Sequence, residues 1–170
     1  MTLASKVSAA CHLRGTFVLR SGLTANSYFD KYRFESDPAL LAEIVSALAP
    51  MVPAGTDGLA GLELGGIPLA TMLSAATGLP VFFVRKQAKK YGTERICEGG
   101  DLAAMRLLIV EDVVTTGGQI VLSAQDLRAE GATVQHALCV IDRESGGGDV
   151  ARAEGIELRS LFSASELESA

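Results

Sequence analysis

The chain has 170 residues, 48% of them apolar and 21% charged, which fits one domain with its own core and is short for two. Its formal net charge of −5 disfavours a dedicated nucleic-acid binder, which needs a basic face, and no apolar run is long enough to span a membrane. Three cysteines, Cys11, Cys97 and Cys139, follow neither a disulfide nor a metal spacing, so a soluble protein of a reducing compartment, the cytoplasm, is expected.

The N-terminal region is predicted to be an appendage to the main domain. Its first residues, MTLASKVSAACHLRG, lack the apolar block of a secretory signal and have spaced apolar positions typical of a helix that ends near Gly15. The following TFVLRSG is typical of a short strand closed by a glycine turn, and NSYFDKYRF is also strand-like. Asp37 and Pro38 then supply the cap and first turn of a helix, which continues to Pro50.

The remainder of the chain alternates strands with single helices. DGLAGLEL and PVFFVRK are strand-like and flank a helical IPLATMLSAATG, while MRLLIVED and ATVQHALCVIDR flank a helical GGQIVLSAQDLRAEG. This alternation implies right-handed crossovers between parallel strands. The expected fold class is therefore α/β, a mainly parallel twisted sheet with helices on both faces and a small N-terminal appendage over residues 1–36.

Residues 86–101 are expected to form a loop that carries function. The segment begins in RKQAKKYGTER, a concentration of basic residues within an acidic chain, and it shows no apolar period with which to bury itself. A flexible loop that grips a small anion and a merely solvated hairpin are equally compatible with this composition.

The stretch LLIVEDVVTTGGQI, residues 107–120, carries the strongest chemical signal. Loops beyond the carboxyl ends of parallel strands are where ligands bind, and glycine-rich backbone at a helix start directs N–H groups at an anion. The two acids before the turn repel phosphate but accept hydrogen bonds from a vicinal diol. A ribose 5-phosphate satisfies both halves, whereas the alternative is a strand that ends in solvated acids and an ordinary turn. The chain contains no Walker GxxxxGK[ST] pattern.

This strand, acid pair and glycine turn resemble the signature of the type I phosphoribosyltransferase family, which binds phosphoribosyl pyrophosphate (PRPP). Within that family the chain is most similar to the orotate phosphoribosyltransferases of pyrimidine (UMP) biosynthesis. FVLRSG with YFD resembles their N-terminal substrate segment, GLELGGIPLA their pyrophosphate loop and following helix, RKQAKKYG their flexible catalytic loop, and VIDR their base-contacting strand end. Four spaced motifs in the right order make this resemblance far more specific than any single motif.

The resemblance implies a role for individual residues. Glu111 and Asp112 would bind the ribose diol, residues 115–119 the 5-phosphate, and loop cations the pyrophosphate. Lys89 would act most strongly in the transition state, so the expected catalytic residues are Lys89, Glu111 and Asp112. The full PRPP-binding set implied is Arg85, Lys86, Lys89, Tyr91, Glu111, Asp112, Val113, Val114, Thr115, Thr116, Gly117, Gly118 and Gln119. The orotate-binding set implied is Arg20, Tyr28, Phe29, Thr115 and Arg143.

Some of these residues have ordinary alternative roles. Arg143 would equally form a surface ion pair, and Tyr28 and Phe29 would equally be core aromatics. The chain also departs from the family pattern. Tyr91 stands where many members carry a loop histidine, and Gly65 stands where some carry a pyrophosphate-contacting lysine.

The reaction implied is transfer of the 5-phosphoribosyl group from PRPP to orotate, giving orotidine 5-phosphate and pyrophosphate. The resemblance further implies Mg²⁺ as cofactor, held mainly by the substrate with no direct protein ligand, and a homodimer whose catalytic loop reaches the neighbouring subunit. No nucleic-acid or membrane partner is expected. Two alternatives stay open at this stage: a phosphoribosyltransferase for another base, and a non-catalytic regulator that senses PRPP.

Overall fold

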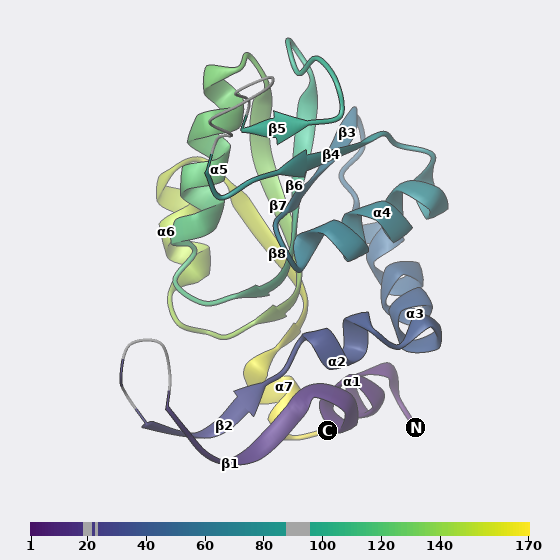
Figure 1. Cartoon of the computed structure of the whole chain (residues 1–170), viewed down its shortest axis with the longest axis vertical. Helices are drawn as coiled ribbons and strands as arrows, with labels where there is room; N and C mark the ends of the chain where they lie inside the picture. The colour runs from purple at the N-terminus through teal and green to yellow at the C-terminus, as the bar shows by residue number, and fades with distance from the viewer. Residues whose placement is uncertain (19–21, 23, 88–95) are drawn as a thin grey trace.

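A six-stranded sheet forms the centre of the protein (Figure 1). The structure is a computed structural model that describes residues 1–18, 22, 24–87 and 96–170. The strand order is β5-β4-β3-β6-β7-β8, and every pair is parallel except β4 with β5. This confirms the predicted α/β class with a mainly parallel sheet. The strands are β3 (Gly58–Leu62), β4 (Val81–Val84), β5 (Cys97–Glu98), β6 (Arg106–Val114), β7 (Thr133–Asp142) and β8 (Glu157–Ser163).

Helices cover both faces of this sheet, as predicted. Helices α3 (Pro38–Leu48) and α4 (Gly66–Thr77) pack on one face, and α5 (Gly118–Ala129) and α6 (Gly147–Ala153) pack on the other (Figure 1). Because side chains alternate along β6, Leu108 and Val110 join the α3/α4 core while Leu107 and Ile109 join the α5/α6 core. None of the helices in the described ranges has both the length and the apolar content that a bilayer crossing requires.

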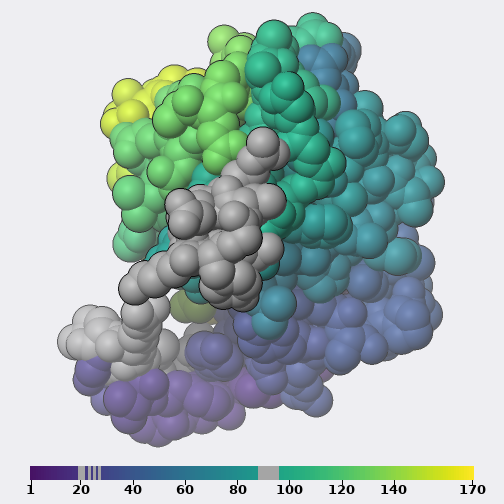
Figure 2. All heavy atoms as spheres, turned by 45° about the horizontal axis from the view of Figure 1, so that its top comes forward, coloured from purple at the N-terminus to yellow at the C-terminus, as the bar shows by residue number. Residues whose placement is uncertain are grey.

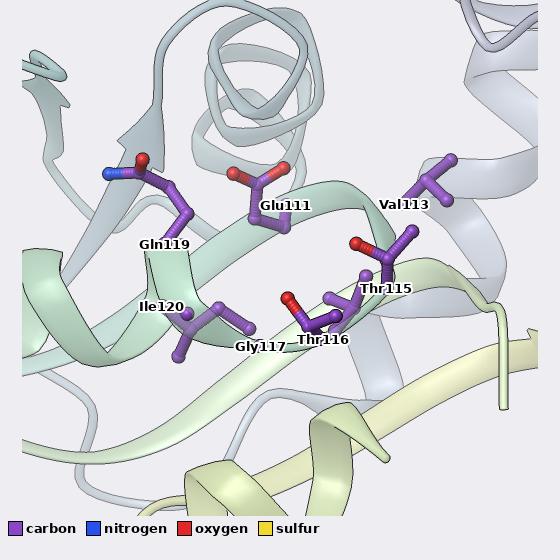
Figure 3. Close-up of a pocket in the computed structure, with 9 residues that line it drawn as sticks. Glu111, Val113, Thr115, Thr116, Gly117, Gln119 and Ile120 are labelled. Atoms are coloured by element: carbon purple, nitrogen blue, oxygen red, sulfur yellow. The ribbon is translucent and has the colours of Figure 1, made fainter. Parts of the chain in front are cut away.

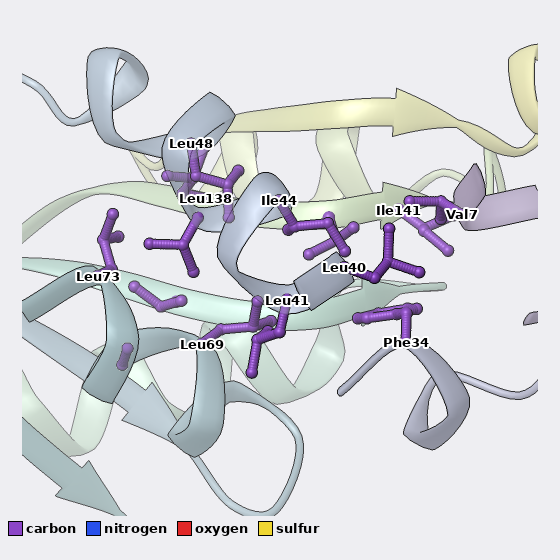
Figure 4. Packing of buried hydrophobic residues seen from close by; sticks show 14 of the residues in the cluster. Val7, Phe34, Leu40, Leu41, Ile44, Leu48, Leu69, Leu73, Leu138 and Ile141 are labelled. Atoms are coloured by element: carbon purple, nitrogen blue, oxygen red, sulfur yellow. The ribbon is translucent and has the colours of Figure 1, made fainter. Parts of the chain in front are cut away.

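The larger core joins the N-terminal region to the main sheet. Val7 and Phe34 are fully buried and pack with leucines of α3 and α4 and with residues of β7 (Figure 4). Burying an aliphatic or aromatic side chain of this size contributes roughly 1.5–3 kcal/mol. The appendage is therefore fixed to the domain by shared core rather than tethered beside it.

The appendage itself differs in detail from the prediction. It contains α1 (Leu3–Cys11), an antiparallel pair β1 (His12–Val18) and β2 (Thr24–Phe29), and a short α2 (Tyr32–Glu35). The first helix thus ends at Cys11 rather than near Gly15, and the second half of NSYFDKYRF is helical. These residues form one end of the molecule (Figures 1 and 2). Helix α7 (Ala164–Glu168) returns the C-terminus to the same end, beside α1 (Figure 1).

Local signals explain where α3 and α4 begin or end. The Asp37 side chain accepts hydrogen bonds from the N–H groups of Ala39 and Leu40, with Pro38 in the first turn, which confirms the predicted start of α3. Gly78 ends α4 in the left-handed conformation, with φ of 75°. By contrast, α6, β8 and α7 were not predicted.

The predicted loop over residues 86–101 is only partly a loop. Residues 97–98 form β5 against β4, and Cys97 is 2% exposed within the α5/α6 core, so the prediction that this segment cannot bury itself is wrong at its C-terminal end. Burial raises the pKa of the Cys97 thiol to about 12, which suppresses the reactive thiolate. The predicted flexibility concerns mainly residues 88–95, which lie outside the described residues.

Candidate active site

A pocket lies where β6 passes into α5. The turn contributes Thr115, Thr116 and Gly117, the first turn of α5 contributes Gln119, and β6 contributes Glu111 (Figure 3). The complete lining is Glu111, Val113, Val114, Thr115, Thr116, Gly117, Gly118, Gln119 and Ile120. The structure therefore brings together all the residues predicted for the phosphate turn and one of the two predicted acids.

The backbone of the turn is shaped for an anion. The first N–H groups of an α-helix have no partner within the helix, and the helix dipole favours negative charge at that end. Gly117 adopts φ of 75°, a left-handed conformation, and a Cβ there would lie 2.7 Å from the carbonyl oxygen of Gly147. Only glycine fits this close approach, so backbone geometry explains the first glycine of TTGG.

The two acids occupy different environments, which corrects one detail of the sequence interpretation. Both lie within β6, which continues to Val114, rather than at its end. Glu111 lines the pocket, whereas Asp112 is fully buried and is not among the lining residues found in the described chain. Burial, followed by the charge of Asp112, raises the pKa of Glu111 to about 9.

Asp112 is held from the N-terminal appendage. Lys31 Nζ lies 2.5 Å from Asp112 Oδ2, and Asp112 Oδ1 accepts a hydrogen bond from the Val113 N–H. The carboxylate fills the space that a side chain on Gly65 would occupy, and Glu35 of α2 also borders that space. Burial, and then the charge of Asp112, raises the pKa of Glu35 to about 8.

The residues predicted to meet the base lie in two settings. Phe29 is 4% exposed, with the His12 ring stacked 4.8 Å away and the Arg143 guanidinium 5.1 Å from its centroid. Phe29 is thus a core aromatic that supports Arg143. Tyr28 is 41% exposed and packs against Phe17, so the prediction that an aromatic ring stacks on the base stays open for Tyr28.

Comparison with known proteins agrees with this geometry. A family model described as "Phosphoribosyl transferase domain" matches residues 38–154, more than half of the chain. The chain belongs to the phosphoribosyl transferase family. It is 47% identical over 169 residues to a Nocardioides protein named orotate phosphoribosyltransferase, covering 99% of this chain and 94% of that protein. The resemblance drawn from the sequence motifs is confirmed.

Solved structures of this phosphoribosyl transferase family show the same architecture. The structure of Mycobacterium tuberculosis orotate phosphoribosyltransferase in complex with Fe(III) dicitrate has a TM-score of 0.87 and 31% identity, covering 97% of this chain and 96% of that one. The same enzyme in complex with 5-phospho-alpha-D-ribosyl 1-diphosphate has a TM-score of 0.83 and 28% identity, covering 98% and 96%.

The cations expected of a phosphoribosyl transferase are only partly described. Arg85 Nε lies 3.7 Å from Glu98 Oε1, and the Lys86 N–H donates to Glu63 Oε1 at 2.7 Å. Both residues follow β4, whose carboxyl end lies at the same end of the parallel sheet as the phosphate turn. This position is compatible with their predicted pyrophosphate contact. Lys89, Tyr91 and Arg20 lie outside the described residues, so their predicted roles remain predictions.

Sequence reasoning missed Lys31 and Glu35 in this phosphoribosyl transferase site. Neither belongs to a periodic pattern or a glycine motif, and their partner Asp112 is far away in the sequence. The available signal was indirect: Gly65, noted as a departure from the family pattern, is the residue whose missing side chain leaves room for the Asp112 carboxylate.

Proposed function

We propose that this protein transfers the 5-phosphoribosyl group from PRPP to orotate, producing orotidine 5-phosphate and pyrophosphate in pyrimidine biosynthesis. The observation that carries the proposal is the pocket that places an acid of β6 beside a glycine-rich turn at the start of α5. A sugar diol and a 5-phosphate on one ligand match these two neighbouring surfaces. The 47% identity to a protein named orotate phosphoribosyltransferase supports the choice of base.

The chemistry is a displacement at ribose C1. The bond from C1 to the pyrophosphate oxygen breaks as the bond from C1 to a ring nitrogen of orotate forms, and the proton of that nitrogen passes to the released pyrophosphate or to water. The turn residues Thr115 to Gly118 hold the 5-phosphate, and Glu111 faces the ribose hydroxyls. Fixing the sugar at both ends aligns C1 with the incoming base and lowers the entropic part of the barrier.

Cations assist departure of the pyrophosphate. Arg85, Lys86 and Lys89 contact it, with Tyr91 beside them, and Lys89 stabilises charge that develops in the transition state. The Glu111 carboxyl and the threonine hydroxyls at the pocket are oxygen groups that can accept hydrogen bonds from the waters of a Mg²⁺ held mainly by substrate oxygens. Bound Mg²⁺ supplies charge neutralisation at the leaving group. No residue of the described chain is proposed as its direct ligand.

The base binds between the appendage and the end of β7. Arg143 follows β7, its N–H donates to the Val114 carbonyl at 2.8 Å, and its guanidinium is held over Phe29. This places a fixed cation next to the turn, where it pairs with the orotate carboxylate. Arg20, Tyr28 and Thr115 complete the base site. We also infer a cytoplasmic homodimer in which residues 86–101 contribute to the neighbouring subunit's site.

The test is the absorbance of orotate after the purified protein is mixed with PRPP, orotate and Mg²⁺. The expected result is a loss of orotate absorbance that occurs only when the protein, PRPP and Mg²⁺ are all present. Uracil and hypoxanthine serve as competing bases. Transfer to hypoxanthine or uracil in preference to orotate would assign another base, and intact PRPP binding without any transfer would indicate a regulatory protein.

A further inference from the structure

A buried ion pair connects the N-terminal appendage to the acid pair of β6. Lys31 lies between β2 and α2, and its ammonium is 2.5 Å from the Asp112 carboxylate. The Asp112 side chain is fully buried, while the Lys31 side chain is 29% exposed. A fully buried carboxylate is costly unless it is paired and hydrogen-bonded, so this lysine is the group that makes the position of Asp112 tenable.

Gly65 provides the space for this pair. A Cβ at position 65 would overlap the Asp112 carboxylate and would approach Glu35 Oε1 to 2.9 Å. Gly65 itself adopts an ordinary helical backbone, with φ of −72°, so conformational freedom is not the reason for a glycine here. The reason is volume: the recess beside the start of α4 is filled by a side chain from β6.

Acidic groups outnumber basic groups around Asp112 among the described residues. Glu35 approaches Asp112 from α2 and Glu111 from β6, while Asp30 acts on Glu35 and Tyr32 on Lys31. Lys31 is the cation in direct contact with Asp112 among the described residues. Burial lowers the pKa of Lys31, but its hydrogen bond and charge interaction with Asp112 outweigh burial, and the net shift is upward. Lys31 therefore stays charged throughout the neutral range.

We propose that Lys31 is a positioning residue for PRPP binding: by anchoring Asp112 in the recess beside Gly65, it leaves Glu111 as the acid that faces the ribose. The inference rests on the proposed function and divides the acid pair into two roles. The Asp112 carboxylate acts on the neighbouring Glu111 carboxyl by charge and by a side-chain hydrogen bond, so moving Asp112 out of the recess changes the group that faces the ribose. Lys31 thereby couples the appendage, which carries Tyr28 of the proposed base site and Phe29 beneath Arg143, to the ribose site.

Replacement of Lys31 by Met tests this role. Without the ammonium, Asp112 is a buried carboxylate beside Glu35 and Glu111, and it must leave the recess or take up a proton. We expect the KM for PRPP to rise at least 10-fold while kcat at saturation changes less than about threefold, because the lost interaction organises binding. Direct PRPP binding measured by calorimetry without orotate should weaken by the same factor. Lys31→Arg, which keeps the charge, should restore most of the affinity.

The matched control is Lys6→Met. Lys6 forms an ion pair of similar length with Glu43, 2.7 Å, but both side chains are substantially exposed and lie away from the pocket. This variant should behave as the wild type. If Lys31→Met folds poorly, the double variant Lys31→Met with Glu35→Gln replaces a carboxyl group that repels Asp112 once ionised by an amide that can donate a hydrogen bond to it. This variant should recover both folding and part of the PRPP affinity.

Gly65→Ala provides an independent route to the same carboxylate. The added methyl group displaces Asp112 from the recess, so the KM for PRPP should again rise, and combining it with Lys31→Met should add little. If the increases in KM caused by Gly65→Ala and Lys31→Met were fully additive in free energy, the inference would be wrong. It would also be wrong if the wild type were active and Lys31→Met had the same KM for PRPP as Lys6→Met. An inactive wild type would instead defeat the proposed function, so the two failures are distinguishable.

Discussion

The phosphate turn and the Lys31 cluster contact the same strand but are built in different ways. The turn is contiguous: Thr115 to Gln119 follow one another, and glycine geometry with a helix start accounts for its shape. The cluster is assembled from Lys31, Gly65 and Asp112, which meet only after the sheet and appendage have packed. A site made of consecutive residues can be recognised as a sequence motif. A site made of residues distant in the sequence can be recognised only in the three-dimensional structure.

The largest expected effect comes from breaking the contiguous turn. Gly117→Ala forces a side chain into a left-handed backbone, at about 1 kcal/mol or more, and into contact with the Gly147 carbonyl. The turn must reshape, which redirects the N–H groups that hold the 5-phosphate. We expect kcat/KM for PRPP to fall about 100-fold or more, measured by orotate consumption.

Gly148→Ala is the matched control for this change. Gly148 lies one residue beyond the Gly147 contact, and a Cβ there meets nothing within 4 Å. Its activity should equal that of the wild type. A Gly117→Ala enzyme within threefold of the wild type would show that the turn backbone is not the phosphate site.

A smaller effect is expected where the appendage meets the end of β7. Arg143→Met removes the guanidinium over Phe29 but leaves the backbone bond to Val114. Charge-assisted hydrogen bonds contribute about 1.5–3 kcal/mol, so the KM for orotate should rise roughly 10- to 100-fold. The KM for PRPP should stay nearly constant. Arg159→Met, which removes an exposed partner of Glu157, is the control, and equal rises in both KM values would contradict a base-specific role.

The same contrast explains how much of the molecule was predictable. Asp37 and Pro38 predicted the start of α3, and the order of apolar strands and helices predicted a parallel sheet, because these signals are local. Residues 26–34 were predicted to be strand-like, but only the first half is strand, and Phe34 packs into the shared core on a helical turn. Packing overrode local preference there.

Prediction of the site also succeeded for consecutive residues and failed for contacts between residues that are distant in the sequence. TTGG and Glu111 line one pocket because the strand, the turn and the helix start are consecutive in the sequence, and their ligand contacts remain a prediction. Burial of Asp112 depends on Lys31 and Gly65, and no period or spacing connects those positions. Likewise, burial of Cys97 depends on pairing of β5 with β4, which a polar, glycine-bearing stretch gave no reason to expect.

The smallest expected effect concerns the pH dependence of stability and isolates Glu35. Its pKa is about 8 in the folded protein, raised by burial and by Asp112 from an ordinary value near 4.5. Between these values the folded chain retains a proton that the unfolded chain releases, so the free energy of unfolding falls as pH rises from about 5 to 8. Glu35→Gln has no such proton to lose, and its stability should fall less over this interval.

Glu35 is only about half buried, so solvent screening limits the difference to about 1 kcal/mol, or roughly 2–4 °C in Tm. Thermal unfolding at pH 5 and pH 8 measures it, with Glu43→Gln as an exposed control on α3. Glu111 titrates in the same direction in both proteins, so its contribution cancels in the comparison. If Tm fell equally in Glu35→Gln and in the wild type, Glu35 would not interact with Asp112 strongly enough to affect stability. The charge interactions of Asp112 would then involve only Lys31 and Glu111 among these residues.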